Sequence, residues 1–292
     1  MSAPAQTYLF VPGSRPDRIA KAIDAGPDAV IVDLEDAVAP ADKPAALDSL
    51  RAGWDGHAAR AQAQRVTLLV RINAADTPWH AADLAACQAL GVAHVVVPKA
   101  ADADALARVR AAVPGALLYP LIESAEGYAH LPAVAGAEGV ARLMFGSVDL
   151  MLDLGIGEDD QPLHYFRSRL VLASRLAGLP APIDGVCVDL RDPEALAAQV
   201  LRARQFGFGA KLLIHPGQIA PVRRGFAPSE AQRAWAQRVV DAAAAADGAA
   251  GGGRWQDGGP PRPHAGAGDP GLPAARLKRR RLSASPSGAS RT

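Results

Sequence analysis

The sequence of 292 residues has few cysteines and few aromatic residues, and it has no long apolar run. Its two cysteines, Cys87 and Cys187, lie in apolar segments without CxxC spacing, and no His/Cys cluster has the spacing of a zinc site. We therefore expect reduced core cysteines rather than disulfides or bound zinc. No segment reaches the roughly 18 apolar residues that span a bilayer, and the N-terminal residues do not resemble a secretory signal. These absences predict a cytoplasmic protein that does not bind membranes.

The charges nearly balance, with 31 Lys and Arg residues against 30 Asp and Glu residues. Eight of the basic residues but only two of the acidic ones lie in residues 254–292, so the rest of the chain is net acidic. A net acidic body disfavours nucleic-acid binding. The KRRR run at residues 278–281 imitates a nuclear or nucleic-acid signal, but we interpret it as part of an inert tail.

Eight short apolar runs recur roughly every 20 to 40 residues, with helix-like segments between them. Continuous Val, Ile and Leu runs are typical of parallel strands that are covered on both faces. The alternation predicts an α/β fold, a (β/α)8 TIM barrel, over residues 1–246, with a last helix over residues 229–246. Residues 247–292 are rich in Gly, Pro and Arg, and we expect them to form an irregular, disordered tail. The eight runs are TYLFVPG, AVIVDLED, VTLLVRIN, HVVVPK, LLYPLIES, RLMFGSVDL, GVCVDL and KLLIHP.

Charged or polar residues follow nearly every run. In a TIM barrel the C-terminal ends of the strands carry the active site. We therefore expect these residues to converge on one face, where carboxylates and an arginine indicate a metal and an anionic substrate. They are Glu35, Asp36, Arg71, Lys99, Glu123, Asp149, Asp189 and His215.

Glu123 and Asp149 are the predicted metal ligands, because they end the fifth and sixth predicted strands. Adjacent strands lie about 5 Å apart, so both carboxylates can reach one ion. Two hard oxygen ligands with room for water and substrate suit Mg²⁺. The alternative is that each carboxylate is a partner in a salt bridge.

Arg71 ends the third predicted strand, in VRIN, and its guanidinium can hold a carboxylate through two hydrogen bonds. It can equally neutralise Glu35 or Asp36. Strand alternation points only one of these two acids directly inward, and we favour Glu35 as the residue that positions a water or Arg71. A lysine that forms a Schiff base, Lys99 or Lys211, is unnecessary if a metal is present.

Two further segments near the predicted strand ends carry polar groups. VPGSRPDR offers helix-start amides and two arginines, which can bind phosphate. His215, in IHPGQ, can donate a hydrogen bond to a substrate, but we favour a histidine whose hydrogen bonds are satisfied at the barrel rim.

Across residues 6–246 the motifs resemble, in order and spacing, the β-subunit of citrate lyase and the malyl-CoA and citramalyl-CoA lyases of the HpcH/HpaI superfamily. The resemblance implies a TIM barrel in which Glu123 and Asp149 hold Mg²⁺, Arg71 grips the carboxylate of a 2-oxo or 2-hydroxy acid, and Glu35 supports the site. It implies coenzyme A across the barrel mouth, with phosphates near Arg15 and Lys21, and a homo-oligomer, a trimer or hexamer. The motifs are LFVPGSRPDR, AVIVDLEDAV, VRIN, VVVPKA, LIESAEG, FGSVDL, IDGVCVDLRD and FGFGAKLLIHPGQI.

The predicted activity is that of a Mg²⁺-dependent carbon–carbon lyase. It would cleave or form a 3-hydroxyacyl-CoA thioester of the citryl-, malyl- or citramalyl-CoA type, with acetyl-CoA and a 2-oxo acid as the products of cleavage. Two alternatives use the same residues: a 2-oxo-acid aldolase that does not need coenzyme A, and a lyase subunit that requires partner subunits.

The C-terminal region departs from the family pattern. Relatives end in a module resembling G-K-M-V-D-R-P and a helix, and in malyl-CoA lyases its Asp enters a neighbouring subunit's site as the acid/base group. Here RWQDGGPPRP stands in its place. A one-base shift allows the same codons to encode the module, so we hypothesise a frameshift that begins between residues 246 and 254. Codons that cannot spell the module, read from the resequenced DNA, would refute this hypothesis.

Overall fold

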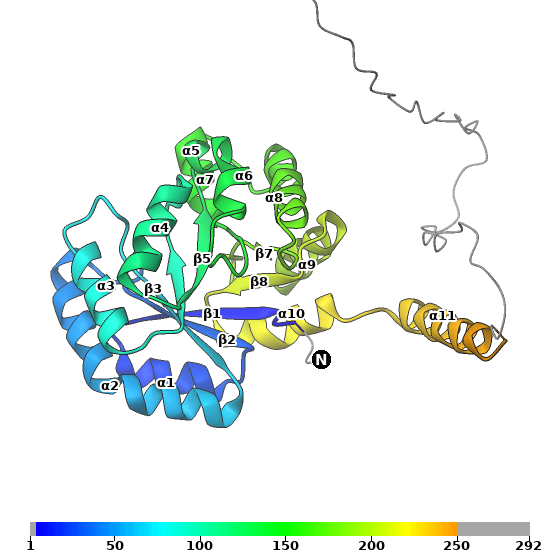
Figure 1. Cartoon of the computed structure of the whole chain (residues 1–292), viewed down its shortest axis with the longest axis horizontal. Helices are drawn as coiled ribbons and strands as arrows, with labels where there is room; N and C mark the ends of the chain where they lie inside the picture. The colour runs from blue at the N-terminus through cyan, green and yellow to red at the C-terminus, as the bar shows by residue number, and fades with distance from the viewer. Residues whose placement is uncertain (1–3, 250–292) are drawn as a thin grey trace, which may run out of the picture. The chain divides into compact units, whose positions relative to one another are not determined.

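The computed structural model describes residues 4–249, and its strands form a closed barrel of eight parallel strands paired in chain order (Figure 1). Each strand is joined to the next through at least one helix, as a parallel connection requires. The predicted TIM barrel is confirmed. The strands are β1 (Thr7–Pro12), β2 (Ala29–Asp33), β3 (Thr67–Arg71), β4 (His94–Val97), β5 (Leu117–Ile122), β6 (Met144–Phe145), β7 (Ile183–Asp184) and β8 (Ala210–Leu213).

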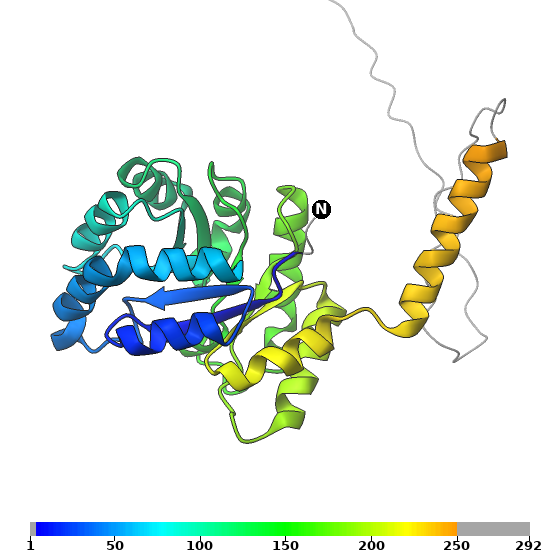
Figure 2. The ribbon, with the colours of Figure 1, turned by 90° about the horizontal axis from the view of Figure 1, so that it is seen from below.

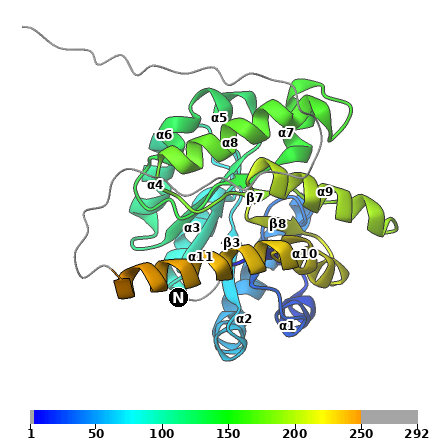
Figure 3. The same cartoon turned by 90° about the vertical axis from the view of Figure 1, so that its right-hand side faces the viewer.

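Helices surround these strands, with α1 and α2 on the opposite side of the barrel from α5, α7 and α8 (Figures 1 and 3). Helices α1 and α2 pack side by side (Figure 2). The helices are α1 (Pro16–Asp24), α2 (Lys43–Gln64), α3 (His80–Ala89), α4 (Ala103–Ala112), α5 (Ala125–Ala129), α6 (Leu131–Ala135), α7 (Ser147–Leu154), α8 (His164–Leu176), α9 (Pro193–Phe206), α10 (Ile219–Phe226) and α11 (Glu230–Ala249), with 3₁₀ turns at η1 (Pro40–Asp42), η2 (Gln161–Leu163) and η3 (Pro216–Gln218).

Alternate residues of each strand face two separate apolar layers. One layer fills the barrel interior and includes Ile31, Leu69 and Leu121. The other lies between strands and helices and includes Val30 and Val70. Because successive side chains of a strand point to opposite faces, every second residue belongs to the interior, and this periodicity continues to the strand ends.

Local capping signals place the helix boundaries. Asp192 accepts hydrogen bonds from the backbone of Glu194 and Ala195, at 2.8 and 3.1 Å, at the start of α9. Gly207 ends this helix with φ of 96°, a left-handed conformation that favours glycine. Asp102 caps α4 through a 2.6 Å bond from the amide of Ala105. Short-range capping chemistry thus fixes the start of α4 and both ends of α9.

The seventh strand differs from the prediction, because it is Ile183–Asp184 and not the run GVCVDL that follows. Asp184 faces the helix layer, where it is fully buried against Arg167 and Lys211, at 3.2 and 2.8 Å. Burial opposes ionisation of Asp184, but the two cations outweigh it and lower its pKa. In the run GVCVDL, Val188 is 66% exposed, and the run forms a loop instead of a strand.

The chain divides into two compact units after Gln232. The barrel lies in the first unit, and helix α11 runs to Ala249, three residues beyond its predicted end. The KRRR run and the stretch that replaces the family's C-terminal module lie outside the described residues. The division into a domain of residues 1–246 and a tail thus stays a prediction. None of the helices within residues 4–249 is long and apolar enough to cross a membrane.

Candidate active site

Strand register brings the charged residues of the site together inside the barrel mouth. Asp33 and Arg71 are paired directly across β2 and β3. Each stands two residues after an interior apolar residue, Ile31 and Leu69 respectively, and Glu123 stands two residues after Leu121. Strand periodicity therefore points all three charged side chains into the barrel. This confirms the expectation that the ends of these strands share one face.

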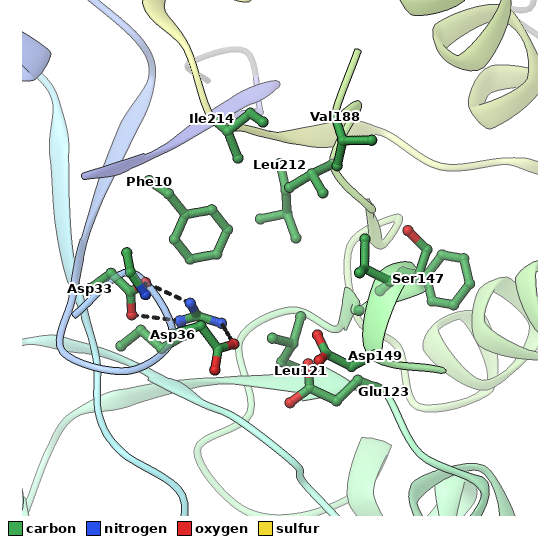
Figure 4. A pocket seen from close by; sticks show the side chains of 16 residues that line it. Phe10, Asp33, Asp36, Leu121, Glu123, Ser147, Asp149, Val188, Leu212 and Ile214 are labelled. Atoms are coloured by element: carbon green, nitrogen blue, oxygen red, sulfur yellow. Dashed lines mark hydrogen bonds and ion pairs between the residues drawn. The ribbon is translucent and has the colours of Figure 1, made fainter. Parts of the chain in front are cut away.

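These residues line a cavity of about 330 Å³ at the barrel mouth (Figure 4). One side carries acidic residues, and the other side is apolar, with Phe10, Leu212, Val188 and Ile214 (Figure 4). The site is thus a concave, largely apolar pocket with a few polar groups, as small-molecule sites usually are. The lining residues are Phe10, Asp33, Asp36, Ala37, Arg71, Leu121, Glu123, Phe145, Gly146, Ser147, Val148, Asp149, Val186, Val188, Leu212 and Ile214.

Arg71 is held by three carboxylates. Its Nε and Nη2 donate to Asp33 at 2.7 and 2.6 Å, and its Nη1 lies 3.0 Å from Glu35 Oε2 and 3.3 Å from Asp36 Oδ2. Burial opposes the charge on Arg71, but Asp33 and its neighbours outweigh it and raise the pKa of Arg71. Arg71 thus pairs with both Glu35 and Asp36, as one of the sequence-based interpretations held, and Asp33 is its strongest partner. Burial outweighs the charge of Arg71 at Glu35 and raises the pKa of Glu35 to about 7.

Glu123 lies opposite this cluster with one oxygen fixed and one free. Its Oε1 accepts a 2.6 Å hydrogen bond from the backbone amide of Lys99. Lys99 has φ of 46°, a left-handed conformation that is costly outside glycine and is often found at functional sites. Oε2 of Glu123 is buried and has no hydrogen-bond partner within the described part of the chain. Burial, with the charges of Glu35 and Asp149, raises the pKa of Glu123 to about 8.

Asp149 reaches the same cavity from a helix, which corrects the prediction that it ends the sixth strand. Strand β6 is only two residues long, and Asp149 lies in the first turn of α7. The carboxylates of Glu123 and Asp149 lie side by side and point into the cavity (Figure 4). Burial, followed by the charge of Asp36, raises the pKa of Asp149. The helix dipole favours the anionic form at this position.

Gly146 and the start of α7 complete this wall. A Cβ atom at residue 146 would lie 2.5 Å from Oε2 of Glu123 and closer still to its Cβ, so only glycine leaves room for that carboxylate. No side chain caps the N-terminus of α7, and Ser147 Oγ is buried without a hydrogen-bond partner among the described residues. The residues at the start of α7 line the cavity, and their first amides have no side-chain acceptor, so they can bind anionic oxygen.

The paired acids fit a divalent cation of the magnesium type. Burial and the mutual repulsion of two adjacent carboxylates disfavour their charged forms, and a cation between them would relieve this. Residues 4–249 contain no group of three or more His, Cys, Asp and Glu residues arranged to hold a metal. The site therefore offers two carboxylates and leaves the other coordination positions to water and substrate, as Mg²⁺ prefers.

The sequence matches the profile of the HpcH/HpaI aldolase/citrate lyase family over residues 6–216. The chain belongs to this family. It is 37% identical over 262 residues to a citrate lyase subunit beta-like protein of Deinococcus radiodurans, with 84% of this chain and 89% of the relative covered. It is 33% identical over 245 residues to a (3S)-malyl-CoA thioesterase of Cereibacter sphaeroides, with 82% and 83% covered. The predicted resemblance and lyase class are confirmed.

Two solved structures of Mycobacterium tuberculosis proteins are similar to this member of the HpcH/HpaI family. One is the protein CitE in complex with magnesium, acetoacetate and coenzyme A, with a TM-score of 0.71 and 33% identity, which covers 83% of this chain and 88% of that chain. The other is a citrate lyase beta subunit with oxaloacetate and magnesium, with a TM-score of 0.68 and 33% identity, which covers 77% and 98%. Magnesium, predicted from the carboxylates of this site, is present in both relatives.

A second cavity, of about 410 Å³, adjoins the first in this HpcH/HpaI barrel, because Phe10 and Ile214 line both. Arg18 and Lys21 lie in its wall. Arg15, which the sequence placed beside Lys21 as a phosphate ligand, does not line this cavity. Its Nε lies 3.3 Å from Asp17.

Three of the predicted strand-end residues have other roles. Asp189 is exposed and accepts hydrogen bonds from the amides of Arg191 and Asp192 in a turn. His215 Nδ1 accepts a 3.0 Å bond from the amide of Gly217, which confirms a satisfied histidine at the rim. Glu35 is buried beside Arg71 and does not line the cavity at the barrel mouth.

Sequence reasoning missed Asp33 and Gly146 as site residues, and it included Arg18 only as the second arginine of the possible phosphate-binding segment VPGSRPDR. Asp33 could have been found from the sequence, because it is the last residue of β2 and alternation places it on the same face as Glu35. Gly146 could not, because its importance comes from the proximity of Glu123, which belongs to another strand. Arg18 lies one turn after Arg15 in α1, so helical periodicity favoured Arg18 and Lys21 as a pair over Arg15.

Proposed function

We propose that this protein is a Mg²⁺-dependent carbon–carbon lyase acting on a 3-hydroxyacyl-CoA thioester of the citryl-, malyl- or citramalyl-CoA type. The observation that carries this proposal is the pair Glu123 and Asp149 facing the Arg71 cluster across one cavity. A substrate with a carboxylate and an adjacent hydroxyl or oxo group fits between a cation-binding pair of acids and a guanidinium. Cleavage would release acetyl-CoA and a 2-oxo acid, and the reverse reaction would condense them.

In this proposal Glu123 and Asp149 hold Mg²⁺, which supplies a Lewis acid for the oxygen that becomes the oxo group. Arg71 binds the substrate carboxylate and fixes its orientation, and Glu35 supports Arg71 from behind. The amides at the start of α7 provide fixed dipoles for negative charge that develops on oxygen. The apolar side of the cavity, with Phe10 and Leu212, excludes water from the carbon centre where the bond breaks.

The second cavity is the proposed site for part of coenzyme A. Arg18 and Lys21 can contact phosphate groups. Because the two cavities share Phe10 and Ile214 in their walls, the thioester arm of coenzyme A can extend from the second cavity into the cavity at the barrel mouth. The similar protein CitE of Mycobacterium tuberculosis was solved with coenzyme A. Arg15 remains a proposed phosphate contact, but Asp17 competes for its guanidinium.

Thioester hydrolysis is the second candidate, because one relative at 33% identity is a (3S)-malyl-CoA thioesterase. A CoA-independent aldolase and a subunit dependent on partners use the same residues. The reaction products distinguish the lyase from the thioesterase. A lyase gives acetyl-CoA and a free 2-oxo acid in equal amounts, and a thioesterase gives free coenzyme A and a hydroxy acid.

The test uses the purified full chain with Mg²⁺ and malyl-, citramalyl- or citryl-CoA. We expect stoichiometric acetyl-CoA and glyoxylate, pyruvate or oxaloacetate, measured by chromatography, and none without the metal. A thermal-shift titration with acetyl-CoA should raise Tm by mass action. Free coenzyme A without an oxo acid would support hydrolysis, and no turnover together with no acetyl-CoA binding would refute the lyase.

We further propose a cytoplasmic homo-oligomer, a trimer or hexamer. Both cysteines are free and buried, which fits a reducing compartment. Light scattering coupled to size exclusion would measure the assembly, and a monomer at working concentration would contradict the proposal.

A further inference from the structure

Asp33 is the most fully engaged carboxylate around Arg71, and it is only 1% exposed. Its Oδ1 accepts hydrogen bonds from Arg71 Nε at 2.7 Å and from the amide of Glu35 at 2.8 Å. Its Oδ2 accepts from Arg71 Nη2 at 2.6 Å and from the amide of Ala37 at 3.0 Å. We infer that Asp33 is a positioning residue that fixes which edge of the Arg71 guanidinium meets the substrate. This inference rests on the proposed function.

The bidentate pair leaves only part of the guanidinium available. The Nε hydrogen and one Nη2 hydrogen bind Asp33, and Nη1 already lies 3.0 Å from Glu35 and 3.3 Å from Asp36. A substrate carboxylate must therefore use the outer hydrogen on Nη2 and compete with Glu35 and Asp36 for Nη1. The Phe10 ring lies 4.8 Å from Arg71 Cζ and restrains the guanidinium from one face. Asp33 and Phe10 together set the plane and the rotation of the group that receives the carboxylate.

The same carboxylate also shapes the loop that carries Glu35, residues 34–36. Asp33 accepts from the amides of Glu35 and Ala37. From the other side, the buried Lys43 donates to the carbonyl oxygens of Leu34 and Glu35, at 2.9 Å each. The loop is thus held through both its donors and its acceptors, and Asp33 couples its position to that of Arg71.

A purely electrostatic role for Asp33 makes a different prediction, and the chain contains a matched comparison. Asp36 carries the same charge 3.3 Å from Arg71 Nη1, but its side chain is 63% exposed. It has no hydrogen bond to backbone amides within residues 4–249. If only charge matters, Asp33→Asn and Asp36→Asn should each remove one negative charge beside Arg71, and both variants should bind an anionic substrate more tightly. If Asp33 positions Arg71, the two variants should change binding in opposite directions.

The experiment measures condensation of acetyl-CoA with glyoxylate or pyruvate, whichever the wild-type enzyme uses, by the full-length variants. We expect Asp33→Asn to raise KM for the oxo acid about tenfold or more, with KM for acetyl-CoA nearly unchanged. We expect Asp36→Asn to lower KM for the oxo acid, because it removes a competing negative charge without removing the pair that fixes Arg71. An unchanged or lower KM for Asp33→Asn overturns the inference, as does an equal rise in both variants.

Two further measurements keep the inference testable. If Asp33→Asn does not fold, Asp33→Glu replaces it, because it keeps the charge but moves the guanidinium by one methylene length. A raised KM for the oxo acid then supports positioning, and an unchanged KM overturns it. If the wild-type protein shows no turnover, KM cannot be measured and a crystal structure of the variant decides; the proposed function itself fails if acetyl-CoA binding is absent as well. Arg71 displaced from its position supports the inference, and Arg71 unmoved overturns it.

Discussion

Replacement of Glu123 by glutamine is expected to abolish Mg²⁺ binding and to reduce kcat by roughly a thousandfold or more, while the barrel stays folded. Glutamine has nearly the same shape as glutamate, and its amide oxygen can still accept the bond from Lys99. The variant removes the charge that holds the cation, together with the oxygen that has no partner. Glu138→Gln is the matched control, because Glu138 is an exposed partner of Arg110 far from the chemistry.

The pH dependence of stability gives this prediction an independent measurement. The pKa of Glu123 rises from 4.5 to about 8 in the folded protein without metal. Between pH 4.5 and 8 the folded state keeps a proton on Glu123 that the unfolded state has lost. The contribution of this proton to the free energy of unfolding is therefore fully present below pH 4.5, and it is lost as the pH rises through 8. Mg²⁺ replaces that proton, so the gain in Tm on adding Mg²⁺ should grow as the pH approaches and passes 8.

Glu123→Gln should lose the gain from Mg²⁺ and the part of the decline that extends to pH 8, and Glu138→Gln should keep both. The decline up to about pH 7 that comes from buried Glu35 should remain in both variants. A wild-type Tm that responds to Mg²⁺ equally at all pH values, or a Glu123→Gln protein that still gains stability from Mg²⁺, would contradict the assignment of the cation to this carboxylate.

The variant Arg71→Lys is expected to lower kcat/KM by about a hundredfold or more. Lysine keeps the positive charge, but it cannot form the bidentate pair with Asp33 and a second pair with the substrate at the same time. The loss should lie mainly in the use of the oxo acid, and the circular dichroism spectrum should not change. Steady-state kinetics in the condensation direction measure it, and wild-type kcat/KM in this variant would contradict a role for the guanidinium.

Arg71→Ala tests the same residue less cleanly. It leaves Asp33 and Glu35 buried without their counter-ion, and loss of one partner of a buried pair typically costs about 3–5 kcal/mol. Reduced activity in Arg71→Ala would therefore mix misfolding with lost binding. A comparison of the Tm values of the Lys and Ala variants separates the two effects, with the Ala variant expected to be the less stable.

Much of the fold follows from local patterns in the sequence. Parallel strands buried on both faces must be continuously apolar, and the segments between them carry recognisable caps such as Asp192 and Gly207. Strand periodicity then explains why Arg71 and Glu123 meet inside the barrel mouth. Family membership supplied coenzyme A, which no residue pattern in this chain could indicate.

The errors arose where tertiary contacts decide the local structure. Asp184 belongs to a strand although it is charged, because Arg167 and Lys211, from other elements, compensate its burial. The more apolar run that follows it was the better local candidate. Asp149 was assigned to a strand because β6 is too short to be recognised, and the helix that carries Asp149 begins without a side-chain cap.

The alternation between interior and helix-facing positions has an evolutionary consequence for this barrel. Deleting a single residue within β3 would turn Arg71 toward the surrounding helices, although every chemical group would still be present. Lengthening a connection between elements has no such effect on the strands. Sequence drift can therefore change the length of connections that carry no site residue, but the spacing from Leu69 to Arg71 and from Leu121 to Glu123 is as strict a requirement for catalysis as the residues themselves.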